Sequence, residues 1–323
     1  MSASPQQIPL PRTLPAIGLS AVIVAAGDDE ARVLAVRTGQ GAAEALPSGP
    51  LEPEHRTLEV GLRAWVERQT GQSLGYVEQL YTFGDRDRSE TEGRSAARAI
   101  SVAYLALVRE GRPASDAAWR NWYRYVPWED WRDGRPTTLA AIEAPLCVWV
   151  GKAGNPTERR TREERVALAF ALGGTPWNEE RVLERYELLY EARLVAEAWH
   201  DAGLPARAEA VAATGAPLAL DHRRILATAV GRLRGKIKYR PVVFELMPPA
   251  FTLNQLQVTI EVLAGVRLHK PNFRRLVESQ GLVEEAGGTA AETGGRPARL
   301  MRFRREVLLE RPAPGFRLSP SRT

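Results

Sequence analysis

The order of helix and strand signals over residues 221–310 constrains the fold of this chain more than any other feature. Thr252 is an N-cap residue, and Gly265 and Gly281 each follow a helical pattern as C-terminal caps do. The predicted elements are helix 221–236, strand 241–247, helix 253–264, helix 270–280 and strands 282–285 and 299–305. This order predicts a winged helix-turn-helix over residues 221–311.

In such a fold two helices are joined by a tight turn, here 253–264 and 270–280, and the second of them enters the major groove of DNA. Phe273, Leu276 and Val277 would face the core, which leaves polar side chains for base edges and phosphates. The predicted DNA contacts are Lys270, Asn272, Arg274 and Arg275 on this helix, Arg296, Arg299, Arg302 and Arg304 on the hairpin, and Thr252 and Asn254 at a helix N-terminus. Taken singly, Arg274 or Arg275 is also compatible with a surface ion pair.

The charge distribution agrees with a polyanionic partner for this region. From Asp221 onward there are 19 Lys and Arg against 9 Asp and Glu, a net charge of +10. The whole chain has a net charge of +5, so the residues before Asp221 carry a net charge of −5. A basic face of this kind favours operator DNA, although an RNA-binding or protein-interaction module would show the same charge.

The first half of the chain has the signals of an α+β domain over residues 16–155. Two apolar runs around 27–30 predict a β-hairpin, and the spacing over 57–70 predicts a helix that ends at Gly71. Further strands are expected at 76–83, 99–108 and 146–150.

A helical connector is expected over 156–220. Thr161 resembles the start of a capping box, and a long amphipathic helix should run from Asn178 to about Gly203. Its apolar face must be buried on its own domain or on a second copy of the chain, and because operator binders are usually twofold we favour a homodimer. Residues 1–15 and 312–323 are expected to be flexible.

The segment from Gly49 to Gly71 resembles the Nudix box, whose helical carboxylates hold the divalent cations that activate water. Aligned on its closing glycine, Ala64-Trp65 replaces the Arg-Glu pair of the box and Arg68-Gln69 replaces the Glu-Glu pair. A guanidinium repels a cation where a metal ligand belongs. We therefore expect no metal, no catalytic residue and no enzyme activity; an active Nudix-type nucleoside-diphosphate pyrophosphohydrolase is the alternative.

A closer resemblance rests on QLYTFGDRDR at 79–88, SVAYLALV at 101–108 and NFRR at 272–275. These motifs are similar to those of the Nudix-related transcriptional regulators of NAD metabolism. The long Trp-rich middle makes the chain more similar to the NadQ-type repressors of NAD biosynthesis than to the shorter NrtR group. The resemblance implies a Nudix-like α/β/α sandwich before the winged helix, and a repressor whose effector is NAD(H), ATP or ADP-ribose.

Residue types in the sandwich permit such an effector. Arginines neutralise a diphosphate and aromatic rings stack on adenine. The predicted ligand residues are Arg37, Tyr81, Phe83, Asp85, Arg86, Arg88, Trp128 and Trp131. The tryptophans are more typical of a core than of a ligand site, and Asp85 is also typical of a turn. The sequence contains one cysteine, no paired histidines and no signal-peptide or membrane-spanning pattern, so we expect a cytoplasmic protein.

Overall fold

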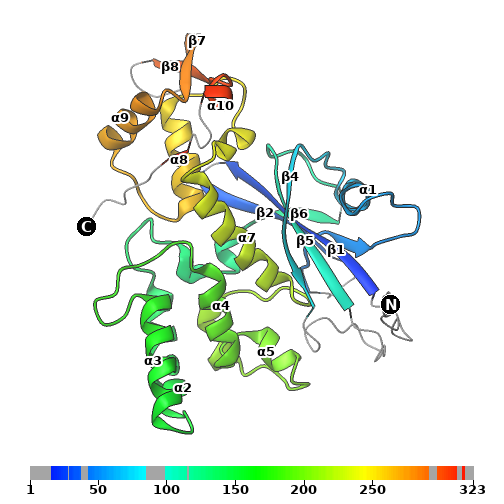
Figure 1. Cartoon of the computed structure of the whole chain (residues 1–323), viewed down its shortest axis with the longest axis vertical. Helices are drawn as coiled ribbons and strands as arrows, with labels where there is room; N and C mark the ends of the chain where they lie inside the picture. Colours follow the sequence, from blue (N-terminus) through cyan, green and yellow to red (C-terminus); the bar gives the residue numbers. More distant parts are fainter. Residues whose placement is uncertain are drawn as a thin grey trace, which may run out of the picture.

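The computed structural model describes residues 16–27, 29–37, 43–84, 99–114, 116–290, 297–310 and 315–316. A mixed β-sheet forms one side of the molecule, a group of helices forms the other, and a small domain with its own hairpin lies at one end (Figure 1). Among the described helices, none is long and apolar enough to cross a bilayer.

The sheet begins with the predicted hairpin, β1 Ala16–Gly27 and β2 Glu30–Val36, paired from Val24–Val33 to Gly27–Glu30. Its strand order is β4-β5-β1-β2-β6, with β3 on β1. The β1–β5 pair is parallel, and the other pairs are antiparallel. The remaining strands are β3 Ser48–Pro50, β4 Tyr76–Phe83, β5 Ala99–Leu107 and β6 Ala117–Asn121.

Alternating side chains of β1 belong to two different cores, as the two-residue period of a strand requires. Leu19, Ala21 and Ile23 pack with helix α1 (Leu58–Thr70) on one face. Val22 and Val24 pack on the other face in a larger core that includes helix α7 (His222–Ile237). Helices on both faces confirm the expected sandwich. The helix that covers the second face is α7, which we predicted as the first helix of the winged helix-turn-helix.

The connector contains α2 Thr137–Gly151, α3 Pro156–Phe170, α4 Val182–Glu191, α5 Ala196–His200 and α6 Ala208–Val211. The strand expected at 146–150 is wrong. In α2 the buried side chains recur at helical spacing, from Leu139 through Ile142 and Leu146 to Val150, and Val148 is 58% exposed. A run of five apolar residues does not distinguish these two structures by itself.

Two other predictions for the connector are also wrong. Thr161 lies inside α3, and the hydroxyl of Thr161 donates to the carbonyl of Thr157. The N-cap of α3 is Asn155 instead. The long helix is divided, because Arg193 has a left-handed φ of 56° between α4 and α5. The apolar face of α4 is buried within the chain's own core, so the first of the two alternatives holds for it.

The small domain contains α8 Leu253–Ala264, α9 Lys270–Gln280, β7 Val283–Ala290, β8 Ala298–Phe303 and α10 Val307–Glu310. The expected strand 241–247 is instead the 3₁₀ helix η4 (Val242–Leu246), and its buried residues Val242, Val243 and Leu246 have helical spacing. A backbone bridge between Phe251 and Met301 extends the wing sheet in its place.

Phe316 corrects the prediction that the whole segment 312–323 is flexible. Its side chain is fully buried and lies 5.9 Å from Phe244 and 6.3 Å from Phe273 between ring centroids. Its backbone N–H donates to the carbonyl of Ile237 at 2.9 Å. This residue therefore belongs to the core of the winged domain.

Candidate functional site

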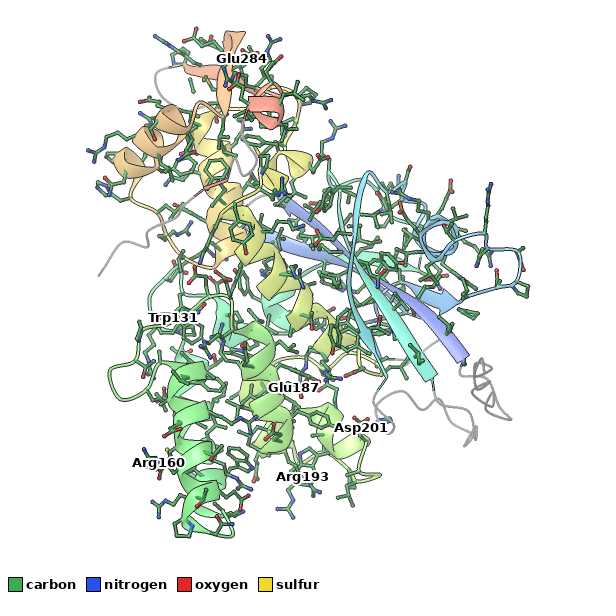
Figure 2. All side chains as sticks on the ribbon, viewed as in Figure 1. Trp131, Arg160, Glu187, Arg193, Asp201 and Glu284 are labelled. Atoms are coloured by element: carbon green, nitrogen blue, oxygen red, sulfur yellow. The ribbon has the colours of Figure 1, made fainter. Side chains whose placement is uncertain are left out.

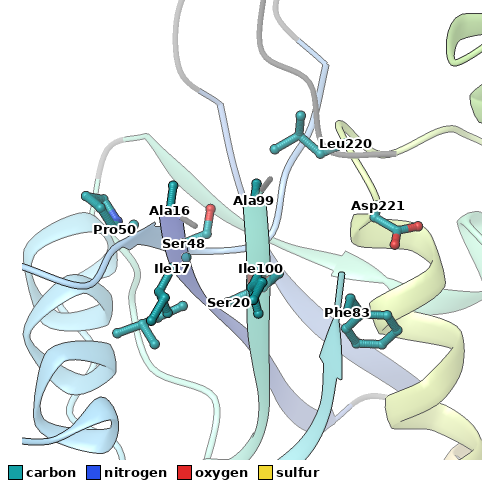
Figure 3. A pocket seen from close by; sticks show the side chains of 14 residues that line it. Ala16, Ile17, Ser20, Ser48, Pro50, Phe83, Ala99, Ile100, Leu220 and Asp221 are labelled. Carbon is teal, nitrogen blue, oxygen red and sulfur yellow. Dashed lines mark hydrogen bonds between the residues drawn. The ribbon is translucent and has the colours of Figure 1, made fainter. Parts of the chain in front are cut away.

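A pocket of about 390 Å³ opens at the end of the sheet where the interior strands β1 and β5 begin (Figure 3). Ser20 forms part of its floor, and its hydroxyl lies 3.1 Å from that of Ser101 across the parallel pair. The lining residues are 16–20 of β1, Ser48–Pro50, Phe83, 99–101 of β5, and Leu220 and Asp221 before α7. Apolar walls with a few hydroxyls and one carboxylate are typical of a small-ligand site.

Helix α1 holds one wall of this pocket through the side chains of Trp65 and Gln69. Gln69 forms reciprocal hydrogen bonds with the backbone of Ser48, at 3.0 and 2.8 Å, and Trp65 donates to the carbonyl of Pro50 at 2.8 Å. The Trp65 ring lies so close to Gly49 that an added Cβ would be 2.2 Å from it. The guanidinium of Arg68 in turn stacks 4.4 Å from the Trp65 centroid.

The remaining acidic positions of this helix do not converge. Glu59 is paired with Arg63 at 2.8 Å, and Glu67 is exposed to solvent. Within the described part of the chain, no group of three His, Cys, Asp or Glu side chains is placed to hold a metal ion.

The predicted ligand residues that the structure describes are not gathered in one site. Phe83 lines the pocket, whereas Tyr81 beside it is 60% exposed. Trp128 is wrong as a ligand contact because it is fully buried in the core, and Trp131 packs on Trp177 with a centroid distance of 4.5 Å. Arg37 bonds to Glu44. Asp85, Arg86 and Arg88 lie outside the described residues.

Sequence reasoning missed Ser48, Pro50, Ser101 and Asp221 as pocket residues. The first two flank Gly49, the first glycine of the Nudix-like segment, and that position was a usable signal. Nothing local marks Ser101 or Asp221, because β5 and the start of α7 meet β1 only in the folded chain.

At the other end of the molecule, α9 presents a polar face. Phe273 and Val277 are buried and Leu276 is half-buried, as the helical period required. The polar side chains predicted to face DNA are all exposed: Lys270, Asn272, Arg274 and Arg275. Arg275 donates to the amide oxygen of Asn272 at 2.5 Å, which aligns two side chains suited to base edges.

The wing and the start of α8 contribute unevenly to this face. Arg299 and Arg302 are 78% and 59% exposed and pair across the hairpin with Glu285 and Glu284, the second of which is labelled in Figure 2. Exposed pairs of this kind are weak, so the guanidinium groups remain accessible to phosphates. Arg304 bonds to the carbonyl of Gly281. Arg296 lies outside the described residues.

Thr252 is wrong as a DNA contact. It is 5% exposed, and its side chain and backbone N–H both bond to Gln255 in a capping box. Asn254 in the first turn of α8 is exposed.

A buried ionic network joins the sheet-containing domain that holds the pocket, called here the pocket domain, to the helix-turn-helix formed by α8 and α9. Glu129 is fully buried and receives hydrogen bonds from Arg185 at 2.5 and 2.9 Å and from Arg234 at 2.6 Å. Arg234 also donates to the carbonyl of Leu263 at the end of α8. The backbone N–H of Trp131, which is labelled in Figure 2, donates to the carbonyl of Gly265.

A second connection is made at the surface. Arg267, in the turn between α8 and α9, places its two terminal nitrogens 3.2 and 3.3 Å from the carboxylate of Asp29 in the β1–β2 turn. The hydrogen bond from Arg267 is the largest cause that holds the pKa of Asp29 below its usual value. The helix-turn-helix is therefore attached to the sheet at its turn.

Comparisons with known proteins agree with this architecture. Residues 243–303 match the model of the NrtR DNA-binding winged helix domain. An Acinetobacter baylyi protein named ADPR responsive transcriptional repressor NtrR is 43% identical over 86 residues, which are 27% of this chain and 34% of that protein. The match thus spans about a third of the relative's length.

Two solved structures extend the likeness to the fold of the whole chain. Shewanella oneidensis NrtR, crystallised with a 27mer DNA, has a TM-score of 0.53 at 21% identity and matches over 90% of this chain and 94% of its own. A MutT/nudix family protein from Enterococcus faecalis has a TM-score of 0.53 at 16% identity, over 93% and 90% of the two chains. The chain thus shares its fold with these two proteins and carries a winged helix domain of the NrtR DNA-binding type over residues 243–303.

Proposed function

We propose that this chain is a transcriptional regulator, acting as a repressor, that binds double-stranded operator DNA through α9 and the wing. The observation that carries the proposal is the match of residues 243–303 to an NrtR DNA-binding domain, together with the exposed polar face of α9. Arg274 and Arg275 are the residues we assign to base edges, and Arg299 and Arg302 to phosphates. The regulated genes are those of NAD biosynthesis, as the family resemblance implies.

The Nudix-like domain senses an adenine nucleotide of the NAD family in this proposal. ADP-ribose is the first candidate, because a relative is named as responsive to it; NAD(H) and ATP are the others. The domain binds without hydrolysis, because Trp65 and Gln69 tie the helix to the pocket wall where the Nudix box would present carboxylates. An active pyrophosphohydrolase is the alternative.

The regulator acts in the cytoplasm as a homodimer on a palindromic operator, in line with the twofold symmetry of most operator binders. Nucleotide binding changes operator affinity only if the two conformations of the protein bind the nucleotide differently. The network through Glu129 and the Asp29–Arg267 pair connect the domain that holds the pocket to the end of α8 and the turn that precedes α9.

A gel-shift titration with the DNA upstream of the chain's own gene tests this function, with a shuffled duplex of equal length as the control. We expect selective retardation that 1 mM ADP-ribose changes and adenosine does not. Equal retardation of both duplexes favours an RNA-binding or protein-interaction module. In a parallel incubation with Mg²⁺, turnover of ADP-ribose at about 1 s⁻¹ or more would establish the hydrolase alternative.

A further inference from the structure

Three arginines converge on one carboxylate at an edge of the Nudix-like sheet. Arg37 follows β2, Arg120 lies in β6, and Arg124 lies in the 3₁₀ turn after it (Trp122–Arg124). Arg37 Nη2 is 3.1 Å and Arg120 Nε is 2.7 Å from Glu44 Oε1, and Arg124 Nε is 3.8 Å from Glu44 Oε2. We call these three residues the arginine cluster.

The charge of the arginine cluster is not balanced by Glu44. That carboxylate is 6% exposed and also accepts a hydrogen bond from the hydroxyl of Tyr125 at 2.7 Å. Burial alone raises the pKa of Glu44, but the hydrogen bonds from Tyr125 and Arg120 and the nearby guanidinium charges outweigh burial and lower it. The ionised carboxylate neutralises one charge of three, and a net charge of +2 remains.

The arginine cluster also has hydrogen-bond donors to spare. A guanidinium carries five N–H groups in a planar fork. Each of the three contacts Glu44 through a single nitrogen, and the side chains of Arg37, Arg120 and Arg124 are 55%, 32% and 52% exposed. Among the residues that the structure describes, no other side chain forms a hydrogen bond or ion pair with these three guanidinium groups.

The position of the arginine cluster separates it from the operator-binding face. Asp29, which contacts the helix-turn-helix, precedes β2, whereas Arg37 follows it. The seven residues of β2 span about 23 Å at the usual rise per residue. The cluster instead adjoins the pocket: the carbonyl of Glu44 accepts from Ala219, directly before the wall residue Leu220.

We propose that Arg37, Arg120 and Arg124 form a binding site for a phosphate or diphosphate group. Three forks with a net charge of +2 match the charge and the many acceptor oxygens of a diphosphate better than a single carboxylate. The inference rests on the proposed nucleotide-sensing function when the diphosphate belongs to the effector, and free pyrophosphate is the other source of the same chemistry. Without an anion, Glu44 offsets only part of the charge of the three guanidinium groups.

Titration calorimetry on the full chain at fixed ionic strength tests the site, with ADP-ribose, pyrophosphate and adenosine as ligands. Arg124→Gln and Arg37→Gln should each weaken binding of the two phosphate ligands about 10- to 100-fold, the worth of one charge-assisted bond. Arg160→Gln, which removes a charge paired with Glu164 on exposed α3, is the matched control and should have no effect. Glu44→Gln should tighten binding, because it raises the local charge to +3.

The outcomes separate this site from the proposed function. If wild type binds ADP-ribose and both arginine variants bind it equally well, the phosphate site is wrong and nucleotide sensing stands. If only pyrophosphate binds, and the variants weaken it, the site stands and the proposed effector fails. If the wild type binds neither phosphate ligand, the site is refuted. It is also refuted if the Glu44→Gln variant unfolds at the same temperature as the wild type but binds the phosphate ligands more weakly.

Discussion

Replacing Glu129 by glutamine should destabilise this protein more than the loss of any surface ion pair. The side chain is fully buried with Arg185 and Arg234, which are also buried, and it receives three charge-assisted hydrogen bonds of 2.5–2.9 Å. Glutamine keeps the shape but leaves two guanidinium groups without a buried counter-charge. Breaking such a pair by removing one partner typically costs about 3–5 kcal/mol.

Urea unfolding followed by circular dichroism measures this loss, with Glu164→Gln as the control because Glu164 pairs with Arg160 on the exposed face of α3. The control should cost about 0.5 kcal/mol or less. The double variant Glu129→Gln/Arg234→Gln should cost less than the sum of its single variants, since the second change removes one of the two unpaired charges that the first creates. A Glu129→Gln variant as stable as the control would refute the structural role of this network.

Three further predictions follow from other parts of the molecule. Arg274→Ala or Arg275→Ala should each cost about 1–3 kcal/mol in operator binding by gel shift, and unchanged affinity in both would displace α9 as the reader. Burial lowers the pKa of His222 to about 4 from 6.5. Between these two pH values the folded state binds fewer protons than the unfolded state. The free energy of unfolding should therefore fall by roughly 3 kcal/mol as the pH drops from 6.5 to about 4. His222→Gln should flatten this slope in urea titrations, and His200→Gln should leave it unchanged. Phe316→Ala should lower stability by about 3–5 kcal/mol in the same assay, and an unaltered midpoint would argue against its core position.

Much of the fold could be predicted because the signals are local. The hairpin of β1 and β2 followed from two apolar runs around a short turn, and α1 from apolar spacing between Thr57 and Gly71. The face of α9 followed from helical periodicity alone, since the period determines which side chains share a side. The short run 146–150 was ambiguous for the same reason: five residues do not contain enough turns to reveal a helical period.

The site depended on contacts that the sequence by itself does not encode in any local pattern. Burial of Trp128, the pairing of Glu129 with arginines 56 and 105 residues away, and the joint lining of the pocket by Ser20 and Asp221 all arise from packing between distant segments. The amino-acid sequence alone predicted an α+β domain before a winged helix, because periodicity, caps and turn residues act over a few positions, and the resemblance of its motifs to a known family implied that this domain is a Nudix-like sandwich. Only the tertiary structure decided which charges are buried, which aromatic residues are core, and where a ligand can enter, because these depend on which surfaces exclude water when the chain folds.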